Sequence, residues 1–313
     1  MNRYAPEGTY MARPENRDML SSAEALTRAM ERGDILEAIA KLCDSSMTLH
    51  FELGGISAIM PKEEVQYLKV GEECKDIAVL TRVGKPVCFK VIGFTHLDDG
   101  RTAAVLSRRA AQAECAECFI KTLVPGDVIP AKITHMENFG AFVDIGCGIV
   151  SLLSIDCISV SRISHPSDRF TIGDRINCVI KEIDDDGRIY VSHRELLGTW
   201  EENAAFFTPG ETVAGIVRSV ESYGIFVELT PNLAGLAELK PDVVVGDTAA
   251  VYIKSMIPEK MKIKLIIIDH YPAEQNRDVQ YFLDPISCPH LDRWQYSPIG
   301  ASKTIETTFI SEE

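Results

Sequence analysis

At 313 residues, 46% of them hydrophobic, the chain is long enough to form more than one domain with a buried core. Its formal net charge of −14 at pH 7 excludes a protein that is basic throughout and holds nucleic acid mainly through phosphates. A single basic face is still compatible with that total. No run of about twenty apolar residues occurs, so the sequence predicts no membrane-spanning helix and no membrane partner.

The first residues lack a basic stretch followed by an apolar one and therefore do not resemble a secretory signal. The nine cysteines are odd in number and scattered, which favours free thiols in a reducing, cytoplasmic environment. Cys115 and Cys118 form an isolated CxxC pair, and Cys288 and His290 have no second pair nearby. We interpret all four as structural residues and expect no metal and no other cofactor.

Residues 1–33 predict an N-terminal arm followed by a helix. The first twenty residues are polar and predict an irregular, mobile segment. Residues 22–32 are good helix formers, with Ser21 or Ser22 as the N-cap and Gly33 as the end of the helix.

Residues 34–110 predict a first unit built of strands. Residues 35–42 and 47–56 are strand-like, and the alternation of the second stretch places Leu49, Phe51 and Leu53 in a core. Residues 86–94 and 103–107 predict two further strands joined by a turn at Asp98-Asp99-Gly100. Residues 111–122, rich in alanine and glutamate, predict a connecting helix.

Residues 138–145 and 222–229 are two copies of one pattern, and they align without a gap back to Gly126 and Gly210. Apolar and polar residues alternate after the glycine of each copy, as in a half-buried strand. In the first copy Val143 and Ile145 are predicted to face the core, and Phe142 and Asp144 to face solvent. In the second copy Val227 and Leu229 are predicted to face the core, and Phe226 and Glu228 to face solvent. Gly140 and Gly224 predict a bulge or tight bend that brings Phe139 and Tyr223 onto the same exposed face.

Residues 123–197 contain five strand-like segments, at 127–136, 140–145, 149–153, 175–183 and 187–192. Five short strands in one unit predict a small closed barrel of the OB type. After a linker at 198–206, residues 207–271 predict a third such unit, and the aromatic residues of the tail 272–313 predict partial docking on it. The predicted fold is therefore all-β with short helices: three tandem five-stranded OB-fold barrels, the first diverged. Trp200 and Trp294 are interpreted as packing anchors where units meet.

Several motifs of the second unit occur as a set: Gly126-Asp127-Val128, residues 138–144, Gly148-Ile149-Val150, Gly173-Asp174 and residues 184–192. Together they resemble the S1-type RNA-binding domain, the OB-fold repeat of ribosomal protein S1 and of many bacterial RNA-processing proteins. The third unit keeps the first half of this pattern. The first unit resembles an early repeat of ribosomal protein S1 through residues 52–56 and 106–109.

The resemblance implies that RNA lies across one face of a barrel, contacted by two aromatics, a histidine, an aspartate and an arginine. In the second unit these positions are held by Phe139, Phe142, Ser151 in place of the histidine, Asp184 and Arg188. In the third unit they are held by Tyr223, Phe226, Glu238 in place of the histidine, Pro258 and Lys262. In the first unit Met47 and His50 replace the aromatics, and Arg101 is out of register. We therefore expect the second unit to be the principal RNA contact, the third to assist, and the first to be mainly structural.

The resemblance implies a cytoplasmic bacterial protein that binds single-stranded RNA, mRNA included, in translation, with the ribosome as a further partner. No phosphate loop, GxSxG elbow, HExxH motif or dinucleotide fingerprint occurs, so the sequence predicts no enzyme. The alternative is a protein-interaction module that docks on the ribosome or an RNA-processing complex and whose RNA faces have decayed. The charge of −14 and the residues Ser151 and Glu238 favour that alternative.

Two further alternatives concern single residues. The four aromatics could instead lie in a core or under a neighbouring unit, and Arg188 could pair with Asp184 within the hairpin. The run Asp184-Asp185-Asp186-Gly187 is interpreted as a turn and not as a metal loop, because the spacing of a calcium loop is absent.

Overall fold

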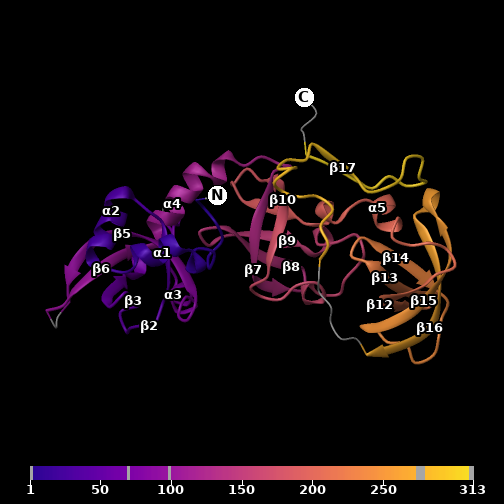
Figure 1. Ribbon diagram of the computed structural model, residues 1–313, viewed down its shortest axis with the longest axis horizontal. Helices are drawn as coiled ribbons and strands as arrows, with labels where there is room; N and C mark the ends of the chain where they lie inside the picture. The colour runs from indigo at the N-terminus through magenta and orange to yellow at the C-terminus, as the bar shows by residue number, and fades with distance from the viewer. Residues whose placement is uncertain (1–2, 69–70, 98–99, 273–278, 310–313) are drawn as a thin grey trace. The chain divides into compact units, whose positions relative to one another are not determined.

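The computed structural model describes residues 3–68, 71–97, 100–272 and 279–309. They divide into two compact units: residues 1–123 with 130–132 and 144–150, and residues 124–129, 133–143 and 151–313. The predominance of strands over short helices confirms the predicted all-β class (Figure 1). Among the described residues, no helix has both the length and the apolar character needed to cross a bilayer.

The α-helices are short, and their bounds are α1 Pro14–Met19, α2 Ala23–Arg32, α3 Asp76–Leu80, α4 Arg108–Cys118 and α5 Trp200–Ala204. The predicted caps of α2 are confirmed. The Ser22 side chain accepts a hydrogen bond from the amide of Ala25, and Gly33 ends the helix with a φ of 65°, a left-handed conformation that favours glycine. The predicted connecting helix corresponds to α4.

The prediction of an irregular, mobile segment at residues 1–20 is wrong for the described residues 3–20. They contain α1 and a 3-10 turn at Tyr10–Ala12, and Glu7 is 6% exposed. Glu7 Oε1 lies 2.7 Å from Nε of Arg108, which is itself buried. Because Arg108 lies 101 positions from Glu7 in the chain, the local composition of residues 3–20 does not predict that this ion pair orders them.

The first sheet has six strands in the order β1-β5-β6-β4-β3-β2. Their bounds are β1 Leu36–Ile39, β2 Leu42–Cys43, β3 Leu49–Leu53, β4 Ile56–Met60, β5 Pro86–His96 and β6 Thr102–Ser107. The expected closed five-stranded barrel is therefore corrected to a curled sheet. Its first strand is broken into β1, which pairs with β5, and β2, which pairs with β3.

Within this first sheet the predicted core residues Leu49, Phe51 and Leu53 are buried, which confirms the alternation. The predicted turn at Asp98-Asp99-Gly100 falls partly outside the described residues, because positions 98 and 99 are not among them.

The second sheet is a closed barrel in the order β10-β11-β9-β8-β7. Its strands are β7 Val128–Glu137, β8 Gly140–Gly146, β9 Ile149–Ser154, β10 Arg175–Ile183 and β11 Ile189–Ser192. All five predicted strands are present, each within two residues of its expected limits. The barrel interior takes the inward-facing apolar residues, including Val143 and Ile145 as predicted.

The third sheet is a second closed barrel, in the order β12-β13-β14-β16-β15. Its strands are β12 Thr212–Glu221, β13 Gly224–Thr230, β14 Leu233–Ala237, β15 Asp247–Ile257 and β16 Lys262–Pro272. Both closed barrels arrange their strands in the same order, in which the third strand pairs with the fifth, as the internal repeat predicts.

The C-terminal tail packs on both closed barrels. Its strands β17 Arg293–Gln295 and β18 Glu306–Thr308 pair with each other. Trp294 and Tyr296 are buried in the core of the third barrel together with Trp200, so the tail packs on that barrel and both tryptophans belong to its core. Phe309, also in the tail, packs against Val179 and Leu196 of the second barrel, which was not expected.

Two carboxylates predicted to face solvent are buried, so this part of the repeat prediction is wrong. Asp144 is 1% exposed and Glu228 is 4% exposed. Asp144 accepts hydrogen bonds from the backbone amides of Glu7, Gly146 and Gly148. The alternation of apolar and polar residues predicts which side chains fill the barrel. It does not predict which other segments of the chain cover the outer face of the strand.

Candidate nucleic-acid interface

Each closed barrel carries a pair of aromatic rings at the start of its second strand. The ring centroids of Phe139 and Phe142 are 6.0 Å apart with planes at 89°, and those of Tyr223 and Phe226 are 6.1 Å apart at 88°. Phe139 is 55% exposed and Tyr223 is 68% exposed, while Phe142 and Phe226 are half-buried. The rings therefore lie on an outer face as predicted, and the edge-to-face arrangement leaves ring surface open for stacking.

Gly140 and Gly224 allow this arrangement by close approach of the backbone. A Cβ at Gly140 would lie 2.4 Å from the carbonyl oxygen of Leu153, and one at Gly224 would lie 2.6 Å from that of Ala237. Gly224 pairs with Glu221 across a two-residue turn at positions 222 and 223, so of the two predicted alternatives the structure has the tight bend and not the bulge. The irregularity lies in β12 at residues 217–219, on the strand that pairs with β13.

The aromatic pair of the third barrel opens into a pocket of about 510 Å³, called here the lysine pocket. Besides Tyr223 and Phe226, its lining includes Leu236, Glu238, Lys254, Lys262 and Lys264. The three lysines are exposed, and within the described part of the chain their ammonium groups have no hydrogen bond or ion pair to another residue. The pocket combines ring faces with cations, which are the two components that single-stranded nucleic acid requires.

The aromatic pair of the second barrel has a different neighbourhood. His135 stacks on Phe142 with centroids 6.0 Å apart, and its Nε2 lies 2.7 Å from Oε1 of Glu137. The predicted residues Asp184 and Arg188 meet in the β10–β11 hairpin, but the backbone amide of Arg188 donates to Asp184 Oδ1 at 2.8 Å. The guanidinium of Arg188 is left 68% exposed, 4.0 Å from a carboxylate oxygen of Asp186.

The run Asp184 to Gly187 closes this hairpin as a turn, which is how it was interpreted. The amide of Gly187 donates to the carbonyl of Asp184, and the amide of Asp184 donates to the carbonyl of Arg188. Among the residues that the structure describes, no group of three or more potential metal ligands comes together.

Strand register relates the two faces position by position. Tyr190 pairs with Leu152 in the second barrel, and Lys264 pairs with Leu236 in the third. The same register makes Arg188 the counterpart of Lys262. A tyrosine whose hydroxyl lies 3.5 Å from Asp184 therefore stands where the third barrel places an unpaired lysine.

Ser151 does not lie on the outer face, which corrects its predicted place. It is 3% exposed, and its hydroxyl donates to the carbonyl of Ile189 at 2.6 Å. By the register of β9, Ser151 corresponds to Gly235, whereas Ser154 corresponds to Glu238. Ser151 and Ser154 are three residues apart, and residues an odd number of positions apart point to opposite faces of a strand. The position predicted from the motif therefore faces inward.

Comparison with known proteins bears on the second barrel. The S1 RNA binding domain family matches residues 123–194. Residues 123–194 are therefore similar to the S1 RNA binding domain, and they are called the S1 domain below.

The S1 domain lies within a longer region of similarity to small ribosomal subunit protein bS1. The relative from Staphylococcus saprophyticus is 34% identical over 46% of this chain and 38% of its own length. The homolog from Bacillus subtilis is 33% identical over 50% and 41%, and the protein from Mycobacterium tuberculosis is 30% identical over 65% and 44%. The chain thus spans less than half the length of these relatives. A multidomain protein with nucleic acid binding domains from Streptococcus pneumoniae is 15% identical, with a TM-score of 0.24 over 76% of this chain and 74% of that chain.

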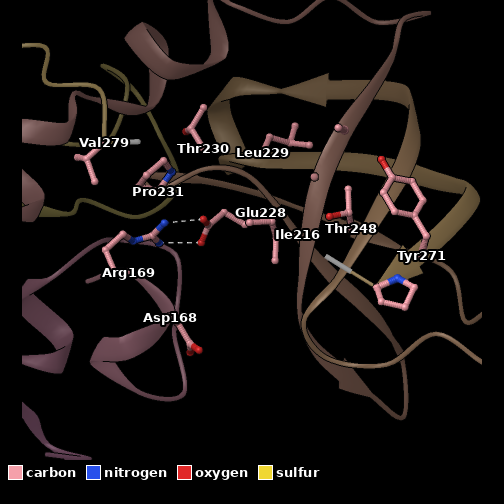
Figure 2. Close-up of a pocket in the computed structure, with 13 residues that line it drawn as sticks. Asp168, Arg169, Ile216, Glu228, Leu229, Thr230, Pro231, Thr248, Tyr271 and Val279 are labelled. Atoms are coloured by element: carbon pink, nitrogen blue, oxygen red, sulfur yellow. Dashed lines mark hydrogen bonds and ion pairs between the residues drawn. The ribbon is translucent and has the colours of Figure 1, made fainter. Parts of the chain in front are cut away.

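A buried ion-pair cluster joins the third barrel to the S1 domain. Arg169 and Glu228 are 59 residues apart in the chain, so no local sequence pattern predicts their contact. Glu228 of β13 accepts hydrogen bonds from Arg169 at 2.8 and 2.9 Å (Figure 2). It also accepts two hydrogen bonds from Arg218, both at 2.9 Å. Burial alone would raise the pKa of the Glu228 carboxyl, but the two guanidinium groups hold it below its ordinary value. One carboxylate thus serves two cations, which leaves the cluster with a net positive charge.

Two lysines of the site, Lys254 and Lys264, were also missed as site residues. Lys264 carried a usable signal, because Lys262, Ile263, Lys264 and Leu265 alternate along β16 and the structure exposes both lysines while burying the other two. Lys254 carried less signal, because its role depends on the pairing of β15 with β16.

Proposed function

We propose that this chain is a cytoplasmic RNA-binding protein of translation that holds single-stranded RNA, mRNA included, on the outer faces of its two closed barrels. The observation that carries the proposal is the lysine pocket, which places three unpaired cations around two aromatic rings. The S1 domain and the similarity to ribosomal protein bS1 support the same function and the ribosome as a partner.

The charge of the pocket is opposite to that of the chain. The whole sequence carries −14, yet three lysines line the pocket against one carboxylate, Glu238. An acidic chain repels RNA at long range, so a cationic site on its surface concentrates binding at one place. Base stacking supplies about 1–3 kcal/mol per base, and the lysines add phosphate contacts.

The exposed rings also favour single strands over duplexes. A ring can stack only on a base whose face is free, and bases in a duplex are already stacked on their neighbours. The exposed rings thus support a protein that binds single strands.

The experiment is a fluorescence-anisotropy titration of labelled single-stranded RNA at low and physiological salt, with duplex RNA as competitor. We expect saturable binding that weakens with salt and that duplex competes for poorly. Phe226→Ala should weaken binding by about 1–3 kcal/mol. Tyr67→Ala, which removes a half-exposed ring from the first sheet's unit, is the matched control and should bind like wild type. No binding of wild type at low salt would contradict the proposal.

Protein docking is a second candidate function, supported by a separate observation. Exposed apolar side chains occur on the third barrel at Leu239, Val244, Val245, Ile266 and Ile268. Such residues favour contact with a protein surface. Co-sedimentation with ribosomes should distinguish the two candidates, because Ile268→Asp would abolish a protein contact and leave RNA binding intact.

A further inference from the structure

A second cavity adjoins the lysine pocket. It measures about 500 Å³ and lies between residues 160–164 of the S1 domain and strand β12 of the third barrel. We name it the 160–164 groove. Its lining also includes Arg218, Ser219 and Glu221. The groove and the lysine pocket share Tyr223, Phe226 and Ala234, so the same ring pair borders both.

We propose that the 160–164 groove is a second subsite, which takes the sugar-phosphate backbone of the nucleotides that follow those stacked at Tyr223 and Phe226. The inference rests on the proposed function and deepens it, because it makes one RNA strand contact the S1 domain and the third barrel at the same time. Arg162 is its principal residue.

The walls of the groove are held in place before any ligand arrives. The amide of Val160 donates to Asn232 Oδ1 at 2.9 Å, and the amide of Ser161 donates to the carbonyl of Pro231 at 3.1 Å. Asn232 is fully buried, and the Arg169–Glu228 pair joins the same two parts of the chain. A groove built on fixed elements binds without a further cost of ordering its walls.

The charge of the groove suits phosphate. Arg218 lines it and shares Glu228 with Arg169, so two guanidinium groups are balanced by one carboxylate. Arg162 is exposed, and within the described ranges its guanidinium makes no hydrogen bond or ion pair to another residue. The lining contains one carboxylate, that of Glu221. Arginine presents a planar fork of donors that matches two oxygens of a phosphate.

The experiment compares a short and a long single-stranded oligonucleotide on the full chain. Oligonucleotides of about 4 nucleotides can fill one barrel face, and those of about 12 can extend into the groove. For wild type, affinity should rise with length. Arg162→Gln should weaken the long oligonucleotide about two- to fivefold, as expected for one exposed ion pair, and leave the short one unchanged. Arg162→Lys should restore part of the loss.

Lys303→Gln is the control for charge, because it removes one exposed cation of the tail. It should affect neither oligonucleotide. Equal weakening of both oligonucleotides by Arg162→Gln, or no weakening of the long one, would overturn the subsite while leaving the proposed function standing. Failure of wild type to bind either oligonucleotide would overturn the proposed function, and the subsite with it.

Discussion

The second and third barrels share a strand order and a ring geometry but differ in the charges around the rings. Phe139 and Phe142 meet at nearly the same distance and angle as Tyr223 and Phe226. Beside the first pair lies a histidine bound to a glutamate, and beside the second lie three lysines. The repeat therefore preserves a stacking platform, while positions outside the repeated segment determine how strongly that platform attracts a polyanion.

The buried carboxylates at one repeat position extend the comparison. Burial and the neighbouring charge of Glu7 raise the pKa of Asp144 to about 7. Glu228, at the same position of the second copy, has a lowered pKa because two arginines surround it. The two copies of this position thus have opposite pKa shifts. Glu7 and Arg169 come from segments outside the repeat, and Arg218 stands where the first copy has Thr134.

Removing the shared carboxylate should have the largest effect. Glu228→Gln leaves the buried guanidinium of Arg169 and the partly buried one of Arg218 without a counter-charge, which should lower the free energy of unfolding by about 3–5 kcal/mol. Urea denaturation of the full chain measures this loss. Glu238→Gln, an exposed change in the same barrel, is the control and should stay within about 0.5 kcal/mol of wild type. Equal stability of the two variants would contradict the role of the cluster.

The same carboxylate predicts a pH dependence. Because the folded pKa of Glu228 is lowered, its contribution to stability is fully present above the unfolded pKa of about 4.3 and is lost as pH falls through the folded value. The stability difference between wild type and Glu228→Gln should therefore be constant near neutral pH and shrink in acid. Denaturation at several pH values measures it, and a difference that grows in acid would contradict the assigned ion pairs.

The lysines should govern the salt dependence of RNA binding. Lys262→Gln with Lys264→Gln should lower the slope of log affinity against log salt by about 1.4, since each phosphate contact to a single strand contributes about 0.7. Arg188→Gln in the second barrel should lower it by about 0.7 or less. Titrations at four salt concentrations give these slopes. A larger change for Arg188→Gln would reverse the comparison of the two faces.

A substitution that makes the second barrel resemble the third should have the smallest effect. Tyr190→Lys places a cation at the position equivalent to Lys264, so the salt slope should steepen by about 0.7. Tyr190→Phe is the matched control, because it removes the hydroxyl near Asp184 without adding charge. An unchanged slope for Tyr190→Lys would show that no phosphate passes this position.

The strands of the closed barrels could be predicted because alternation is a local property, and β10 has the limits that its sequence indicates. The buried clusters could not, because their members are far apart in the chain. Arg169 is 59 residues from Glu228, and Glu7, one of the three residues whose amides donate to Asp144, is 137 residues away. The aromatic residues were found through the repeat. Ser151 was assigned to the wrong face of its strand because an alignment that is shifted by an odd number of residues exchanges the two faces.

The expected ranking of the barrels also changes for a physical reason. The sequence comparison favoured the second barrel, because it keeps more of the family motif. The structure surrounds the rings of the third barrel with cations that come from two strands, β15 and β16. The barrel that matches the family motif better is thus not the barrel whose charges suit RNA better.

The most direct test is a side-by-side titration of two double variants, Tyr223→Ala/Phe226→Ala and Phe139→Ala/Phe142→Ala, against one single-stranded RNA on the order of 20 nucleotides, long enough for two OB folds. Circular dichroism should first show that both variants remain folded. We expect both variants to lose affinity for the RNA and the third-barrel variant to lose more. A greater loss for the second-barrel variant, or wild-type affinity for the third-barrel variant, would contradict this expectation.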